Sequence, residues 1–148
     1  MNHPMKSSGL ARRGFLRLGA FVAASALLPA KLLAAMVRPK EAFVAVGLEN
    51  AFAQIGGTPE AHEGIIFTTP DIAENGAVVP VKVEVDSTKL PNVDKIYVLV
   101  EMNPNPLSAI FNIPEGTQPL VETRVKVAQT CNLYAVAEAN GKLYMASK

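Results

Sequence analysis

The sequence predicts a mainly all-β domain, an antiparallel β-sandwich with one helix before it. Alternation after Asn75-Gly76 places four valines on one face of a strand: Val79, Val81, Val83 and Val85. Similar short segments recur between turn residues to give roughly seven strands. One segment ahead of them has helical spacing. This pattern is typical of an immunoglobulin-like β-sandwich; a small barrel and an α+β sheet with the helix on one face are the alternatives.

Residues 1–35 have the organisation of an export signal. They contain five basic and no acidic residues, an apolar run at 18–28 that is too short to span a membrane, and small residues at Ala34-Ala35. The pair Arg12-Arg13 indicates the twin-arginine route. The alternative is a basic, disordered N-terminus. We therefore expect an exported, periplasmic domain at 36–148.

Without residues 1–35 the chain carries nine Lys and Arg and thirteen Asp and Glu, a net charge of 9 − 13 = −4 with His neutral. This acidic balance offers no basic face for nucleic acid, and we expect no nucleic-acid partner. No second apolar stretch is present, so we expect no membrane span.

The elements are expected in the following order. Pro39 precedes a helix at 41–55, which Gly56-Gly57 ends, and residues 58–63 form a loop. Strands follow at 65–69, 79–86, 95–102, 107–113, 121–127, 131–139 and 142–146.

Turn chemistry supports this order. Asn75-Gly76 can take positive φ, so the chain can reverse or bulge there. Pro80 lacks an N–H and must lie at an edge, at a bulge or in the first residues of its strand. Pro104 and Pro106 predict an extended corner, and Asn140-Gly141 predicts a two-residue hairpin.

Cys131 is the one cysteine of the sequence, so an intramolecular disulfide is excluded. It shares its alternation phase with Leu133 and Ala135, and we interpret it as a small structural core residue; a reactive thiol is the alternative. His62 has no metal-ligand spacing with it. We expect no metal, no cofactor and no catalytic residue.

The motifs together resemble the SoxY family, the sulfur-carrier subunit of the periplasmic thiosulfate-oxidising Sox system. The similar stretches are 70–81, 103–107, 123–130 and 141–144, and their characteristic positions are Asn75, Gly76, Pro80, Asn103, Pro104, Pro106 and Arg124. The resemblance implies an immunoglobulin-like sandwich that forms a heterodimer with a SoxZ subunit. It also implies a carrier rather than a catalyst.

Members of that family carry sulfur on the cysteine of a flexible Gly-Gly-Cys-Gly-Gly arm, which other Sox enzymes act on. The present sequence ends at Met145-Ala146-Ser147-Lys148, where the resemblance implies a further strand and then the arm. An incomplete gene, a shortened paralogue or a tail supplied in another way would explain this, and we expect the first. The strand at 142–146 would then be an unpaired edge.

Three functions follow as hypotheses. The leading one is a periplasmic SoxY-like carrier subunit that pairs with SoxZ and lacks its arm in this chain. The alternative is an exported immunoglobulin-like module that binds a protein partner and carries no sulfur. A third is a thiol-dependent enzyme that uses Cys131.

Overall fold

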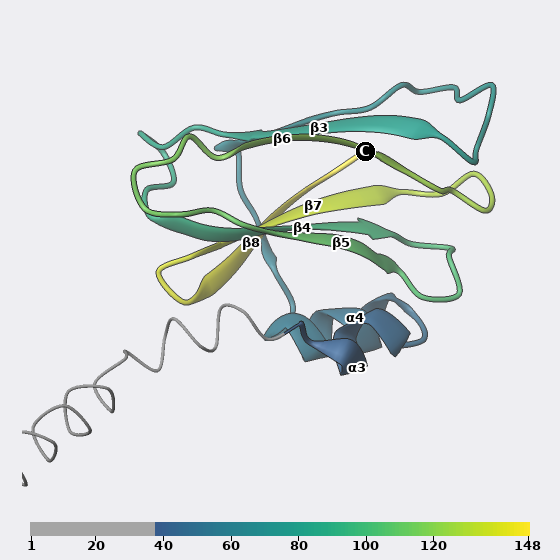
Figure 1. The fold of residues 1–148 in the computed structure, drawn as a ribbon, viewed down its shortest axis with the longest axis horizontal. Helices are drawn as coiled ribbons and strands as arrows, with labels where there is room; N and C mark the ends of the chain where they lie inside the picture. The colour runs from purple at the N-terminus through teal and green to yellow at the C-terminus, as the bar shows by residue number, and fades with distance from the viewer. Residues whose placement is uncertain (1–37) are drawn as a thin grey trace, which may run out of the picture. The chain divides into compact units, whose positions relative to one another are not determined.

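Two β-sheets face each other in the computed structural model, which describes residues 38–148 (Figure 1). The five-stranded sheet has the order β1 (Glu60–Ala61), β8 (Lys142–Ser147), β7 (Leu133–Ala139), β4 (Val93–Val100) and β5 (Leu107–Asn112). The three-stranded sheet has the order β2 (Ile65–Thr68), β3 (Val79–Val85) and β6 (Leu120–Val125). All strand pairs except β1–β8 are antiparallel, which confirms the predicted β-sandwich.

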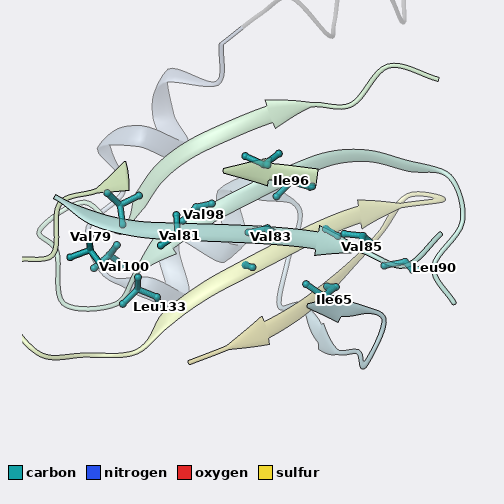
Figure 2. Close-up of a cluster of buried hydrophobic side chains, with 14 of the residues drawn as sticks. Ile65, Val79, Val81, Val83, Val85, Leu90, Ile96, Val98, Val100 and Leu133 are labelled. Carbon is teal, nitrogen blue, oxygen red and sulfur yellow. The ribbon is translucent and has the colours of Figure 1, made fainter. Parts of the chain in front are cut away.

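The core lies between the two sheets, as Figure 2 shows. The four valines of β3 point into it, each at most 3% exposed, and meet residues of β4 such as Ile96, Val98 and Val100. Alternation in β3 therefore predicts its buried face correctly, because successive side chains of a strand point to opposite faces.

The predicted single helix at 41–55 is wrong, since residues 40–55 form two helices. Helix α3 (Lys40–Val44) and helix α4 (Leu48–Ile55) are separated by extended backbone at Ala45 and by Gly47, whose φ is +83°. A φ of this sign does not continue a right-handed helix. The predicted stop is confirmed: the N–H of Gly57 donates to the Phe52 carbonyl at 2.9 Å.

The helices cover the outer face of the five-stranded sheet, away from the three-stranded sheet (Figure 1). Their buried residues Ala42, Ala51 and Phe52 pack against a second apolar cluster that includes Tyr97 and Leu99 of β4. The β4 strand thus has apolar side chains on both faces, because both faces are covered.

Two predictions need correction, one about residues 58–63 and one about the strand at 142–146. Residues 58–63 are not all loop, because Glu60 and Ala61 form β1, in parallel register with Tyr144 and Met145 of β8. The last strand is therefore not an unpaired edge over those two residues, and its other side pairs along its length with β7. A two-residue strand carries too little alternation to be recognised in sequence.

Other turn predictions are confirmed. Asn140 and Gly141 have φ of +53° and +75°, as the two-residue β7–β8 hairpin requires. Pro104 and Pro106 lie in the connection between β4 and β5, and Pro106 is fully buried.

Pro80 is the second residue of β3 and lies within the predicted first residues. The even-numbered residues of β3, to which Pro80 belongs, direct their backbone N–H and C=O groups towards β2. Strand β2 ends at Thr68, which lies opposite Lys82, so β2 does not reach as far as Pro80. The donor that Pro80 lacks would therefore have no strand partner, which explains how a central strand tolerates it.

Candidate functional site

Three loops meet at one end of the sandwich, which we call the loop end. They are the β2–β3 loop (residues 69–78), the β4–β5 loop (residues 101–106) and the β6–β7 loop (residues 126–132). Figure 1 shows them on the same side of the domain, beyond the ends of the strands. The first two contain most of the characteristic positions identified in the sequence.

Gly76 holds the β2–β3 loop against the β6–β7 loop. Its carbonyl accepts a hydrogen bond from the Val127 N–H at 2.7 Å, and a Cβ on Gly76 would lie 2.7 Å from the Val127 carbonyl oxygen. Neither Asn75 nor Gly76 has positive φ, so the predicted backbone freedom is not what this site uses. Glycine is required here by the close approach of two backbones.

Asn75 stabilises the same loop from within. Its Oδ1 accepts from the Ala77 N–H at 3.0 Å, and its carbonyl accepts from the Val78 N–H at 3.2 Å. This is an Asx turn, in which a short polar side chain replaces a backbone acceptor.

Asn103 joins the β4–β5 loop to the β6–β7 loop. Its Nδ2 donates to the Lys126 carbonyl at 2.8 Å, and its Oδ1 accepts from the Ala128 N–H at 3.0 Å. One amide thus satisfies a donor and an acceptor of a neighbouring loop, where no strand partner is available. Pro104 lies exposed beside it.

Glu101 and Asn132 form a further connection that sequence reasoning missed. Glu101 Oε2 accepts from both the backbone N–H and the side-chain Nδ2 of Asn132, at 3.2 and 3.1 Å. Burial, with the nearby Glu101 carboxylate, raises the pKa of Tyr134. In the sequence, Asn132 beside Cys131 is the one sign of this connection. A single polar residue in a loop does not indicate which distant residue it contacts.

Lys148 also lies at the loop end. Its N–H donates to the Leu133 carbonyl at 3.0 Å, its carbonyl accepts from the Leu133 N–H at 2.8 Å, and its Nζ lies 3.3 Å from Asp71 Oδ1. The last residue of the sequence is thus tied to the first residue of β7 and to the β2–β3 loop.

Cys131 lies in the β6–β7 loop, two residues before β7 begins, so its predicted place in a strand is wrong. The side chain is half-buried and packs against the rim of the core. It borders a hollow of about 420 Å³ that the β2–β3 and β6–β7 loops line, with Pro70, Ile72 and Gln129 among its walls. That Cys131 is a structural residue rather than a reactive thiol stays a prediction.

The remaining characteristic positions lie in the strands, close to where these strands join the loop end. Pro80 and Arg124 face each other across β3 and β6, on the outer surface of the three-stranded sheet. His62 packs edge-on against Tyr144, and its Nδ1 accepts from the Gly64 N–H at 3.0 Å. Arg12 and Arg13 lie outside the described residues.

Within residues 38–148, no group of three or more His, Cys, Asp or Glu side chains is placed to hold a metal ion. No helix in that range is long and apolar enough to cross a membrane. The chemically distinctive feature of the loop end is a half-buried thiol on a surface that polar side chains fix in place.

The family model described as "Sulfur oxidation protein SoxY" matches residues 50–148, which include all three loops. The chain belongs to the SoxY family. The sulfur carrier protein SoxY from Chlorobium limicola f thiosulfatophilum is a solved structure with a similar fold. It is 35% identical, covers 74% of this chain and 94% of its own, and superposes with a TM-score of 0.62.

A comparison with curated proteins gave no match. The SoxY assignment agrees with the resemblance seen in the sequence. All the stretches that carried that resemblance lie within the matched residues, and the structure brings two of them, 70–81 and 103–107, against the third, 123–130, at the loop end.

Proposed function

We propose that this chain is a sulfur-carrier subunit of a periplasmic system that oxidises thiosulfate or a related sulfur compound. It is exported by the twin-arginine route through Arg12-Arg13 and pairs with a SoxZ-like subunit. The match to the SoxY family over residues 50–148, with a solved relative that is named a sulfur carrier, is the observation that carries the proposal.

The geometry fits a carrier in one further respect. A carrier holds its substrate covalently and presents it to other enzymes, so it needs an attachment thiol and a fixed recognition surface rather than an acid–base pair. The loop end supplies such a surface, because Gly76, Asn103 and Glu101 each tie one loop to another.

Pairing with a SoxZ-like subunit is supported by the edge strand β5. Ala109, Ile110 and Phe111 are half-buried, although β5 has a strand neighbour on one side alone in the part of the chain that the structure describes. A half-covered apolar strand at the edge of a sheet is a suitable place for a second subunit, which would complete its burial.

The test is the intact mass of the protein recovered from the periplasm after growth on thiosulfate, measured before and after treatment with a reductant. A mass equal to that of a chain that begins near Met36 supports export and cleavage of the signal. A sulfur-containing increment that the reductant removes supports the carrier function, because a sulfur atom held on a thiol is released by thiol exchange.

The Cys131→Ser variant locates the attachment. Loss of the increment would place it on Cys131, whereas its persistence would place it on a thiol outside the present sequence, whose one cysteine is Cys131. Absence of any increment from both proteins would overturn the carrier function. Co-purification of a SoxZ-like subunit from the same cells tests the pairing separately.

The binding module is the second candidate, and one observation favours it. Large apolar side chains are exposed on the loops of the loop end, among them Ile72 at 85%, Met102 at 51% and Val78 at 49%. Such side chains are typical of a surface that recognises a protein. An unmodified protein that retains a protein partner would support this function.

A further inference from the structure

Strand β6 is an open edge of the three-stranded sheet. It pairs with β3 on one side, and among the strands of residues 38–148 the order β2-β3-β6 gives it no neighbour on the other side. An unpaired edge presents a row of N–H and C=O groups that another strand can complete.

The register fixes which residues face outward along this edge. The N–H of Val85 donates to the Pro119 carbonyl at 2.9 Å, and the pairing with β3 continues without a shift to Val125. Odd-numbered residues of β6 therefore exchange hydrogen bonds with β3. Glu122 and Arg124 direct their N–H and C=O groups to the open side, because these directions alternate along an antiparallel strand.

The sequence of β6 is complementary to itself when a second copy runs antiparallel. With Thr123 opposite Thr123 of the second copy, Glu122 lies opposite Arg124 and Arg124 opposite Glu122. The same register places Val121 opposite Val125 on the core side. Opposite charges, matching apolar residues and paired threonines are all favourable cross-strand pairs.

The hydrogen-bond pattern agrees with this register. Each Glu122–Arg124 pair falls at a position where two strands exchange both backbone hydrogen bonds, which uses the groups left open in one copy. The Thr123 pair falls at a non-hydrogen-bonded position on the twofold axis. One register thus satisfies the backbone and the side chains together, as an isologous interface requires.

We propose that β6 pairs with β6 of a second copy of this chain, in antiparallel register about Thr123, to join two three-stranded sheets into one. This interface lies in the three-stranded sheet, whereas β5 belongs to the five-stranded sheet. The inference does not depend on sulfur carriage.

Charge reversal tests the register. Sedimentation velocity of the exported protein over a range of concentrations is expected to give a monomer–dimer equilibrium. Arg124→Glu and Glu122→Arg each turn both attractive pairs into repulsive ones and should raise the dimer Kd by roughly tenfold or more. The double variant E122R/R124E exchanges the charges and should restore the dimer. Lys142→Glu, an equal change of charge on β8, should leave the Kd unchanged.

A cross-link provides the second test. Thr123→Cys in a Cys131→Ser background should form an intermolecular disulfide on mild oxidation, since directly opposed residues at non-hydrogen-bonded positions lie about 4.5 Å apart at Cα. Lys82→Cys, on the central strand, should not.

A protein that stays monomeric, single variants that leave the Kd unchanged, or a folded E122R/R124E that fails to dimerise would overturn the proposal. Dissociation of the dimer when a SoxZ-like subunit is added would also overturn it, because the edge would then belong to that subunit. Circular dichroism of each variant distinguishes lost association from lost folding, and the sulfur increment of the mass measurement reports the proposed function independently.

Discussion

The missing side chain of Gly76 lets two loops meet backbone to backbone. The Val127 carbonyl oxygen occupies the volume that a Cβ would need, at 2.7 Å from its ideal position. Any other residue must push the β2–β3 loop away and lengthen the 2.7 Å hydrogen bond between Val127 and Gly76. Glycine is therefore needed at position 76 because it has no side chain, and not because it can adopt positive φ.

We expect Gly76→Ala to lower the free energy of unfolding by about 1–3 kcal/mol, because the added methyl overlaps a backbone atom that cannot rotate away. Urea unfolding measures the change. Glu74→Ala, an exposed substitution in the same loop, should stay within about 0.5 kcal/mol of the unsubstituted protein. Equal stability of the two variants would contradict the contact.

Tyr97 is a buried residue with an acidic partner. Its hydroxyl donates to Glu138 Oε2 at 2.6 Å, and Lys95 Nζ lies 3.1 Å from the same oxygen. Burial, reinforced by the Glu138 carboxylate, raises the pKa of Tyr97 well above its ordinary value of 10.0. The folded protein therefore holds this proton more tightly than the unfolded chain does.

Stability should consequently fall as the pH rises above about 10, because there the unfolded chain binds fewer protons than the folded protein. The contribution of Tyr97 to the free energy of unfolding is fully present below pH 10. It is lost as the pH approaches the raised pKa that Tyr97 has in the folded protein. Tyr97→Phe should have a shallower decline over this range. Unfolding curves of both proteins at several alkaline pH values measure the difference, and parallel declines would contradict it.

At the scale of elements, the three loops of the loop end are tied together outside the strands, by side-chain hydrogen bonds as well as by the backbone bond between Val127 and Gly76. Asn103 bonds to the carbonyl of Lys126 and to the N–H of Ala128, beyond the last residue of β6. Asn105, in the same loop, reaches in another direction and donates to the Ala45 carbonyl at 3.3 Å.

Asn103→Ala should destabilise the protein by about 1–2 kcal/mol and increase hydrogen exchange at the Ala128 amide, because that N–H loses its acceptor. Hydrogen–deuterium exchange detected by NMR measures both effects. Asn105→Ala is the matched control, with no change expected at Ala128. An Ala128 amide that stays equally protected in both variants would show that Asn103 does not hold the loop.

At the scale of the whole molecule, the sandwich depends on each strand presenting one face to the core between the sheets. Ile65 and Ile66 are consecutive residues of β2 with opposite environments, 5% and 52% exposed. Their register with Val85 and Glu84 of β3 sets which of them points inward.

Ile65→Ala should cost about 2–4 kcal/mol of unfolding free energy, since it leaves a cavity in the core, whereas Ile66→Ala should cost less than about 1 kcal/mol. Because both variants replace Ile by Ala, a difference between their free energies of unfolding must come from position and not from the type of substitution. Chemical unfolding of the two variants side by side measures the difference. Similar losses would mean that β2 is not held in this register.

The sequence by itself determined the succession of strands β2 to β8 along the chain, the inward face of β3 and the hairpin at Asn140-Gly141. Alternation and turn chemistry are local, so they can be seen within a few residues. The motif stretches also indicated the SoxY family, which the match over residues 50–148 confirmed.

The tertiary structure decided what depends on residues far apart in the chain. The expected single helix is interrupted at Gly47, and Glu60-Ala61 pair with β8 instead of forming a loop. Cys131 lies at the rim of the core and not in a strand. The tertiary structure also placed Gly76 against Val127 and Asn103 against Ala128. Such contacts form because separate strands end at the same side of a sandwich, and no local pattern records which loops will meet there.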